Sequence, residues 1–331
     1  MKIWFPTIRA RSGSDVYVER LSLELRKRGI DVVVSWFNHL HEVCPILLKR
    51  IPAPPGVDVI HANSWTAFAF KRAGIPLVVT MHHSVHDPEY APYRNLAQAM
   101  YHNLLIRNYE DRGIKAAEKV VAVSHYTADV TARLFGSKKI VVIQNGIDTS
   151  RFSPGIEKII NNQKFNLLFV GSASKRKGFD FLMQVMEKLG PDYHLHYTSE
   201  PGLFGPSPTQ NSSCVEKLNE DQLVNVYRGA DALIYPSRYE GFGYVVAEAM
   251  ACGKPVIAAR TSALPELIEN GENGILCSPD SVEEFIAAIR QLQNDKDYAD
   301  KMALKARKTI VDNFGLDQMV EKYIDLYKSI I

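Results

Sequence analysis

Short apolar runs alternate with stretches of helical periodicity along this chain, and the alternation occurs twice. The runs are continuous rather than alternating, which is typical of parallel strands buried by helices on both faces of a sheet. Strands are expected first at residues 2–6, 31–36, 57–62, 77–81, 120–123 and 139–143, then at 165–170, 193–197, 232–235 and 272–279. The pattern predicts two successive doubly wound α/β domains, which bind ligands beyond the carboxyl ends of their strands.

The boundary between the two domains is expected in residues 145–163, which are rich in Gly, Pro, Ser and Asn. We therefore divide the chain into domains at 1–150 and 151–313, followed by a last helix at 314–331. Residues 201–213 contain too much Gly, Pro and Ser for regular structure. In the first domain, helices are expected at 15–28, 65–73, 93–117 and 126–135.

The composition excludes several classes of protein. The chain has 331 residues, 46% hydrophobic and 23% charged, and its net charge of +2 gives no strong signal for nucleic-acid binding. No apolar run approaches the roughly 18 residues of a transmembrane helix. No signal peptide is evident, and the four cysteines form no C-x-x-C, so we expect reduced thiols and a cytoplasmic location. These cysteines are Cys44, Cys214, Cys252 and Cys277.

One loop and the helix after it carry the clearest chemical signal. Residues 235–256 (YPSRYEGFGYVVAEAMACGKPV) leave a strand, cross a glycine-flanked acidic loop and enter a helix at about Tyr244. Glu240 lies on the loop, and Glu248 lies on an otherwise apolar helix face, where a carboxylate is costly to bury without a partner. The glycines beside Phe242 let backbone N–H groups approach a ligand at a helix N-terminus, which favours anions. The stretch predicts a site for a ligand with a phosphate and several hydroxyls.

Two further loops connect a strand to a helix and can offer backbone N–H groups to phosphate. Residues 171–178 (GSASKRKG) carry Lys175, Arg176 and Lys177 but lack the G-K-[ST] ending of a P-loop, so they suit a diphosphate rather than nucleotide hydrolysis. Residues 11–14 (RSGS) do not form G-x-G-x-x-G, and no acidic residue stands where a dinucleotide ribose contact is expected. The alternative for residues 171–178 is a solvated basic turn, and the alternative for residues 11–14 is a plain strand–helix turn.

Histidines and one acidic pair are weaker candidates. His82 and His83 end the fourth strand, at the sheet edge where ligands bind in this fold. His86 and Asp87 follow, but their spacing fits no standard zinc motif. The D-x-D at 295–297 is far from any Gly-rich loop, and we interpret it as a helix cap rather than a metal site.

Taken together, these stretches resemble the retaining GT-B glycosyltransferases of glycosyltransferase family 4 (glycosyl transferases group 1). The resemblance spans nearly the whole chain, and its most specific element is the E-x(7)-E spacing of Glu240 and Glu248. It implies two Rossmann-like domains facing across a cleft, an acceptor domain at 1–150, a donor domain at 151–313 and a helix at 314–331 that crosses back. The matching stretches are VDVIHAN, VVTMHH, VAVS, IQNGIDTSRFSP, FVGSASKRKGFDFL, PSRYEGFGYVVAEAMACGKPVIA and LPELIENGENGIL.

The resemblance also implies roles for individual residues toward a nucleotide-sugar donor. Glu248 would bind the donor ribose, and Glu240 would hold a hydroxyl of the transferred sugar. Lys177 would stabilise the diphosphate as it leaves, while Gly13 and His82 would approach diphosphate and sugar from the first domain. The implied catalytic residues are Glu240, His82 and Lys177, and the implied donor-binding residues are Gly13, Ser172, Arg176, Lys177, Gly241, Phe242, Gly243 and Glu248.

Two departures from the family pattern bear on the phosphate contacts. Ser172 stands where the family often has Arg, and Lys175 or Arg176 would compensate, as in relatives with a similar G-S-x-x-x-R-K-G form. The first loop lacks the usual paired glycines, which bears on how closely Gly13 approaches the phosphate.

The reaction implied by the resemblance is transfer of a hexose-type sugar, with retention, from a nucleotide-diphosphate sugar to a glycan or lipid-linked acceptor. The expected context is bacterial cell-surface polysaccharide or lipopolysaccharide synthesis, with no metal, no other cofactor and no nucleic acid. Two alternatives stay open: a GT-B sugar-nucleotide epimerase, and a non-catalytic sugar-nucleotide-binding partner, against which the two intact glutamates argue.

The charge of the chain is distributed unevenly. Residues 1–150 hold 19 Lys and Arg against 13 Asp and Glu, a net +6, whereas residues 151–331 hold 20 against 24, a net −4. A basic helix and a loop at 44–55 could dock the first domain on an anionic membrane, at the inner face, that presents a lipid-linked acceptor. The alternative for the charge distribution is chance unevenness on solvated faces. The alternative for the helix is an ordinary amphipathic helix that packs on the core. The helix contains Tyr101, Leu104, Leu105, Ile106 and Arg107.

Overall fold

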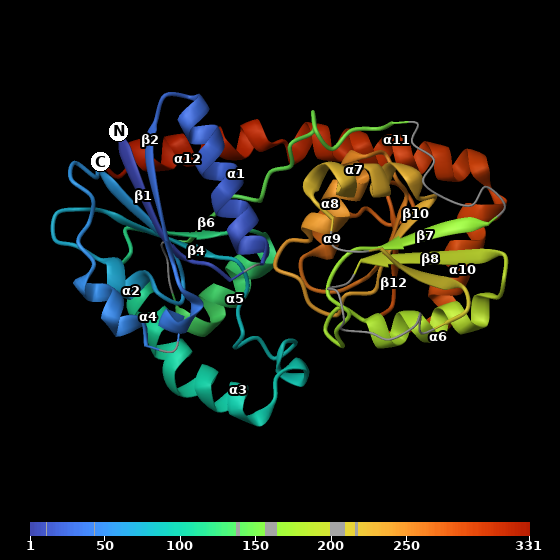
Figure 1. Cartoon of the computed structure of the whole chain (residues 1–331), viewed down its shortest axis with the longest axis horizontal. Coiled ribbons are helices and arrows are strands. Elements are labelled where there is room, and N and C mark those ends of the chain that lie inside the picture. The colour runs from blue at the N-terminus through green and yellow to red at the C-terminus, as the bar shows by residue number, and fades with distance from the viewer. Residues whose placement is uncertain (11, 43, 137–139, 156–163, 199–208, 216–217) are drawn as a thin grey trace. The chain divides into compact units, whose positions relative to one another are not determined.

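The computed structural model describes residues 1–331 except 11, 43, 137–139, 156–163, 199–208 and 216–217. It divides the chain into two compact units: unit 1 contains Met1–Gly146 and Leu316–Ile331, and unit 2 contains Ile147–Gly315. In each unit, helices cover both faces of a parallel sheet (Figure 1). The predicted pair of doubly wound α/β domains is confirmed.

Unit 1 is built on parallel strands that bury apolar side chains on both faces. Its described strands are β1 Lys2–Ile8, β2 Asp31–Phe37, β3 Val59–Asn63, β4 Leu77–Met81, β5 Lys119–Ala122 and β6 Ile140–Val142, in the sheet order β2-β1-β3-β4-β5-β6. Its α-helices are α1 Gly13–Lys27, α2 Ala67–Phe70, α3 Leu96–Tyr101, α4 Arg107–Ala116, α5 His125–Phe135 and α12 Leu316–Lys328. α1 and α12 lie on one face, and α2, α4 and α5 on the other (Figure 1).

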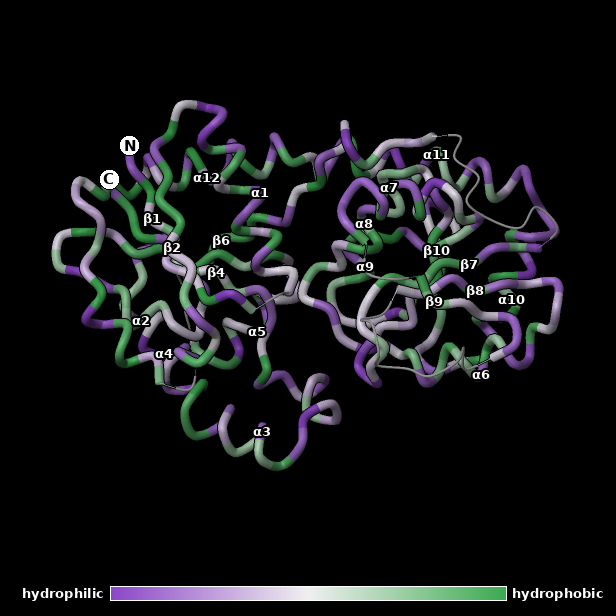
Figure 2. Tube along the Cα trace, in the orientation of Figure 1, coloured by the Kyte–Doolittle hydropathy of each residue, from purple (hydrophilic) through white to green (hydrophobic). Residues whose placement is uncertain are grey.

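Unit 2 repeats this arrangement with its own core. Its described strands are β7 Phe165–Phe169, β8 Tyr193–Thr198, β9 Ser212–Val215, β10 Ala232–Tyr235, β11 Val256–Ala259 and β12 Ile275–Cys277, in the sheet order β12-β11-β10-β7-β8-β9. Its α-helices are α6 Phe179–Leu189, α7 Glu220–Gly229, α8 Tyr244–Ala251, α9 Leu264–Leu267, α10 Val282–Asn294 and α11 Lys296–Asn313. Figure 2 shows hydrophobic strands at the centre of each unit and more hydrophilic chain toward its rim.

The long helical stretch predicted at 93–117 is confirmed over Leu96–Ala116, but it contains a π-helix between two α-helices. The Asn95 side chain accepts the N–H of Gln98 at 2.8 Å, and the Gln98 side chain accepts the N–H of Asn95 at 2.9 Å, so α3 begins at Leu96. A π-helix at His102–Ile106 then separates α3 from α4. The wider turn of a π-helix shifts the register, so the periodicity of one long α-helix does not describe the segment.

Two other local predictions differ from the structure. Within 201–213, predicted to be irregular, β9 begins at Ser212 and pairs in parallel with β8, while 201–208 lie outside the described residues. This edge strand is mostly polar, so the sequence contains no apolar run there that would predict a strand. The helix predicted at 65–73 extends only over Ala67–Phe70.

The described part of the predicted linker at 145–163 packs against unit 2. The N–H of Ile147 donates to the carbonyl oxygen of Phe314 at 2.8 Å. The Arg307 side chain donates to the carbonyl oxygens of Thr149 and Phe152 at 2.8 and 2.6 Å. Residues 147–152 are therefore part of the second unit, and residues 156–163 of the predicted linker lie outside the described residues.

The helix α12 is fixed to the sheet of unit 1 by buried tyrosines. Tyr323 and Tyr327 are fully buried, and the Tyr327 hydroxyl lies 2.6 Å from Nδ1 of His61 on β3. Nε2 of His61 lies 2.6 Å from Oγ1 of Thr80 on β4. Burial lowers the pKa of His61 to about 3, so the neutral ring can donate from one nitrogen and accept at the other.

Replacing Tyr327 with Phe should destabilise unit 1, because it leaves Nδ1 of His61 without this partner. We expect the free energy of unfolding, measured by urea denaturation, to fall by about 1–3 kcal/mol. Tyr298→Phe is the matched control, since its partly exposed hydroxyl donates to the carbonyl of Gly271 at 3.2 Å, where water can replace it. A loss no larger than that of the control would contradict a stabilising role for this anchor.

Candidate functional site

Three neighbouring strands of unit 2 end at the same edge of the sheet. β10 lies between β7 and β11, and all three are parallel, so the loops after them meet. The N–H of Arg238 donates to the carbonyl of Arg176 at 2.9 Å, and Oγ1 of Thr261 donates to the carbonyl of Ser237 at 2.8 Å. The three loops therefore form one connected surface.

Two glycines allow these loops to pack closely. Gly178 has φ of +71°, and a Cβ there would lie 2.2 Å from the carbonyl oxygen of Pro236. Gly243, which precedes α8, has φ of +102°, and a Cβ would lie 2.7 Å from Cδ2 of Leu264. A side chain at either position would combine an unfavourable backbone conformation with a steric clash.

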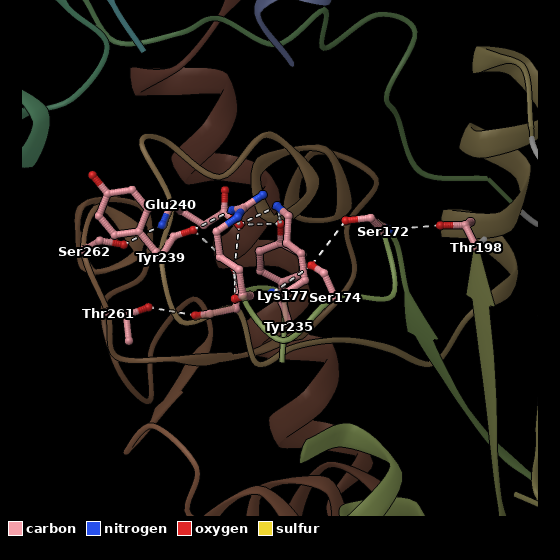
Figure 3. A network of polar contacts seen from close by, with 12 residues as sticks. Ser172, Ser174, Lys177, Thr198, Tyr235, Tyr239, Glu240, Thr261 and Ser262 are labelled. Carbon is pink, nitrogen blue, oxygen red and sulfur yellow. Dashed lines mark hydrogen bonds and ion pairs between the residues drawn. The ribbon is translucent and has the colours of Figure 1, made fainter. Parts of the chain in front are cut away.

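The carboxylate of Glu240 is held by groups that converge on its Oε1 atom (Figure 3). Nζ of Lys177, Oγ of Ser237 and Oη of Tyr235 lie 2.5, 2.6 and 2.9 Å from this oxygen. The guanidinium of Arg176 lies 3.8 Å away. Among the described residues, every hydrogen bond to this carboxylate uses Oε1, which leaves Oε2 to accept hydrogen bonds from a ligand.

The ion pair sets the charge of Glu240. Burial alone would raise the pKa of its carboxyl group, but the charges of Lys177 and Arg176, with hydrogen bonds from Lys177 and Ser237, lower the pKa to about 2. Burial lowers the pKa of Lys177 below its ordinary value, and the negative charge of Glu240 offsets part of this shift. At neutral pH, Glu240 is therefore an ionised hydrogen-bond acceptor and a poor base.

The predicted cations of the 171–178 loop differ in position. Lys177 and Arg176 both approach Glu240, whereas Lys175 is exposed. Ser172, at the position where the family often has Arg, is also exposed. Of the two cations expected to compensate for this serine, Arg176 is the one beside Glu240.

Glu248 is buried on α8, and its neighbour explains how the fold tolerates the charge. Only 5% of its surface is exposed, and the hydroxyl of Tyr227 on α7 donates to Oε2 at 3.1 Å. Burial and the charge of Glu248 raise the pKa of Tyr227 well above its ordinary value, so the hydroxyl keeps its proton. The sequence did not reveal this partner, and the role of Glu248 toward a ribose stays a prediction.

Residues 241–243 connect the Glu240 loop to the N-terminus of α8. The Phe242 side chain is buried, with its ring centroid 6.1 Å from that of Phe314. The first N–H groups of α8 have no carbonyl partner within the helix, and the helix dipole makes this end positive. Gly241, Phe242 and Gly243 lie directly before this positive helix end. That their backbone N–H groups donate to the sugar and phosphate of a donor stays a prediction.

Two of the predicted site residues, Gly13 and His82, belong to unit 1. Gly13 is exposed at the start of α1. His82 follows β4, and its Nε2 lies 3.0 Å from Oδ1 of Asn63. Burial, aided by the charge of His83, lowers the pKa of His82 to about 3, so the ring is neutral and donates from Nε2. Their contact with the ligand of Glu240 stays a prediction.

Sequence reasoning missed three of the groups that hold Glu240. Tyr235 ends β10 and Ser237 follows it, so their place at the carboxyl end of a strand was the available signal. Ser262 follows β11, and its Oγ accepts the N–H of Glu240 at 2.8 Å. Its φ of +44° is unusual for serine, and no sequence pattern indicated it.

The candidate metal ligands have other partners. Among the described residues, no group of three or more His, Cys, Asp or Glu side chains could hold a metal ion. His86 is buried, with Nε2 3.5 Å from Oε2 of Glu110. Asp295 accepts the N–H of Tyr298 at 2.9 Å and caps α11, which confirms the predicted helix cap.

Comparison with known proteins identifies two family domains in the chain. The family model "Glycosyltransferase Family 4" matches residues 43–151, and the model "Glycosyl transferases group 1" matches residues 164–295. The D-inositol 3-phosphate glycosyltransferase of Rhodococcus jostii is 24% identical over 96% of this chain and 84% of its own.

Solved structures of other proteins share the fold of the whole chain. The sucrose-phosphate synthase of Thermosynechococcus elongatus superposes with a TM-score of 0.85 over 99% of both chains, at 18% identity. HepE of Anabaena, solved in complex with UDP-glucose, superposes with a TM-score of 0.80 over 99% of this chain and all of its own, at 21% identity.

The family models cover most of both units, and the structural matches extend over nearly the full length. The chain therefore belongs to the GT-B glycosyltransferases, with a glycosyltransferase family 4 domain followed by a glycosyl transferases group 1 domain.

Proposed function

We propose that the protein transfers a hexose-type sugar from a nucleotide-diphosphate sugar to a glycan or lipid-linked acceptor, with retention of configuration. The observation that carries the proposal is the largely buried ion pair of Lys177 and Glu240, whose side chains are 14% and 11% exposed, at the carboxyl edge of the unit 2 sheet. It offers a cation and an ionised acceptor side by side, which suits a ligand with both phosphates and hydroxyls. HepE, which has the same fold, was solved with UDP-glucose, which supports this class of donor.

The donor diphosphate would lie between two sources of positive potential. Lys177, with Arg176 beside it, supplies fixed cations, and the N-terminus of α8 supplies backbone N–H groups. Negative charge grows on the diphosphate as the sugar–oxygen bond breaks, so both interactions strengthen in the transition state. We propose that these groups serve in place of a metal ion.

Retention is supported by the weak basicity of Glu240 and His82, the two side chains proposed to contact the sugar. An inverting reaction needs a group that takes the proton of the acceptor hydroxyl. Glu240, with a pKa of about 2, and His82, with a pKa of about 3, are both poor bases. In the proposed reaction, the acceptor oxygen bonds to the anomeric carbon on the face from which the diphosphate leaves, and a diphosphate oxygen takes the proton.

In this reaction Glu240 would bind the sugar rather than exchange protons with it. Its Oε2 would accept hydrogen bonds from ring hydroxyls, while Glu248 would bind the ribose and His82 would contact the sugar from unit 1. The acceptor class, a glycan or lipid-linked sugar of bacterial cell-surface polysaccharide or lipopolysaccharide, follows from the family resemblance.

Glu240→Gln and Lys177→Ala should each lower kcat by at least about a hundredfold, because each removes an electrostatic contact to the reacting donor. Activity is measured by nucleotide release with the donor at saturation. Lys188→Ala is the matched control, since Lys188 is an exposed lysine of the same unit, 3.5 Å from Glu283.

Folding must be checked in both variants by circular dichroism, because leaving one charge of a buried pair unpaired costs about 3–5 kcal/mol. Folded variants with near-normal turnover in both would refute the assignment of the site.

The pH dependence of kcat/KM should contain no step from His82 between pH 5 and 8, because its pKa is lowered to about 3 and the ring is neutral throughout this range. The profiles of wild type and His82→Asn should then have the same shape. A step near pH 6.5 that is lost in the variant would show that His82 titrates and would contradict its assignment as a neutral donor.

The product linkage should keep the anomeric configuration of the donor, as seen in the coupling constant of the anomeric proton by NMR. An inverted linkage would contradict retention.

A thermal-shift panel of nucleotide sugars identifies the donor first, since a ligand that binds the folded state raises its melting temperature. Conversion of the sugar nucleotide without any acceptor would favour an epimerase instead.

A further inference from the structure

Most of the exposed large apolar side chains lie in two short segments of unit 1. Among the described residues, twelve such side chains are exposed, and seven of them lie at 40–47 or 96–105. Soluble domains rarely gather exposed apolar side chains without a partner for them. These seven residues, the apolar patch, are Leu40, Ile46, Leu47, Leu96, Met100, Leu104 and Leu105.

A hydrogen bond joins the two segments of the patch. The hydroxyl of Tyr101, at the end of α3, donates to the carbonyl of Glu42 at 2.6 Å. Nearby, the ammonium of Lys49 and the guanidinium of Arg112 lie 5.8 and 4.8 Å from the ring centroid of Phe68. α3 projects away from the sheet of unit 1 (Figure 1).

The α3 segment is amphipathic, and its apolar outer side has no partner within the described residues. Leu96, Met100 and Leu104 follow one another at intervals of four and are 86%, 64% and 69% exposed. His102 and Ile106 lie on the inner side and are buried. Ile106 therefore belongs to the core, whereas the leucines predicted beside it face outward.

The surroundings of the patch are cationic. Residues 90–109 contain Arg94 and Arg107 and no acidic residue, and residues 40–57 contain Lys49 and Arg50 against one acidic residue, Glu42. Lys49, Arg50 and Arg107 are exposed. Two copies meeting through this surface with twofold symmetry would bring like charges together. An anionic lipid surface instead offers an apolar layer and a negative layer that match the patch and its cations.

We propose that the apolar patch docks unit 1 on the surface of an anionic phospholipid bilayer. Apolar side chains of α3 and of the 3₁₀ helix Pro45–Arg50 enter the headgroup boundary, and the flanking cations meet lipid phosphates. Contact is peripheral through this surface, since no helix of the described residues has the length and hydropathy of a membrane span. This docking goes beyond the proposed reaction and can be measured without a sugar nucleotide. It would bring the enzyme to acceptors carried on lipids.

Cosedimentation of the full-length protein with vesicles tests the proposal. We expect binding to phosphatidylglycerol–phosphatidylcholine vesicles at low salt, and binding at least about tenfold weaker to pure phosphatidylcholine or at high salt, because salt screens the charges. Failure to bind the anionic vesicles would overturn the proposal.

Variants locate the contact. The triple change Leu96→Ser, Met100→Ser and Leu104→Ser alters exposed side chains only and should weaken binding at least about tenfold. Leu304→Ser, at a leucine of α11 that is 73% exposed, is the matched control and should bind as wild type. Arg107→Gln should weaken low-salt binding about fivefold.

Two outcomes would contradict this location. Vesicle binding by the triple variant equal to that of wild type would overturn it. A smaller assembly of the triple variant in sedimentation velocity, with vesicle binding unchanged, would show that the patch is a contact between copies of the chain.

Discussion

The largely buried ion pair of Lys177 and Glu240 joins two loops that follow different strands of the unit 2 sheet. It can form because β7 and β10 are neighbours, and because Gly178 lets one loop touch the backbone of the other. Loss of either charge would leave the other buried without its counterion. The same pair lowers the pKa of Glu240 to about 2, so one contact both holds the loops together and fixes the chemical state of the proposed site.

Unit 1 organises its interior in a different way. His61 is buried and His82 is half-buried, both as neutral rings, with hydrogen bonds to Tyr327 and Asn63. The fixed charges of the proposed reaction would therefore come from unit 2, and unit 1 would contribute neutral contacts to the sugar and the acceptor. In this proposed division of roles, the leaving diphosphate would take the acceptor's proton.

Much of the fold could be predicted because buried parallel strands appear as continuous apolar runs, and the strands predicted at 77–81 and 232–235 coincide with β4 and β10. The edge strand β9, the π-helix and the anchor between His61 and Tyr327 could not, since they depend on polar or distant residues. Within the site, motifs indicated Glu240 and Lys177. Ser262 and Tyr227 are brought to the glutamates by neighbouring elements and leave no local pattern.

If the donor binds at the Lys177–Glu240 pair, its effect on the backbone should be local. Hydrogen–deuterium exchange of the full-length protein, with and without a saturating nucleotide sugar, measures this directly. We predict slower exchange in residues 171–178 and 236–248, which carry the pair, the glycine-rich turn and the start of α8. Unchanged exchange in both segments, or protection confined to unit 1, would contradict a donor site on unit 2.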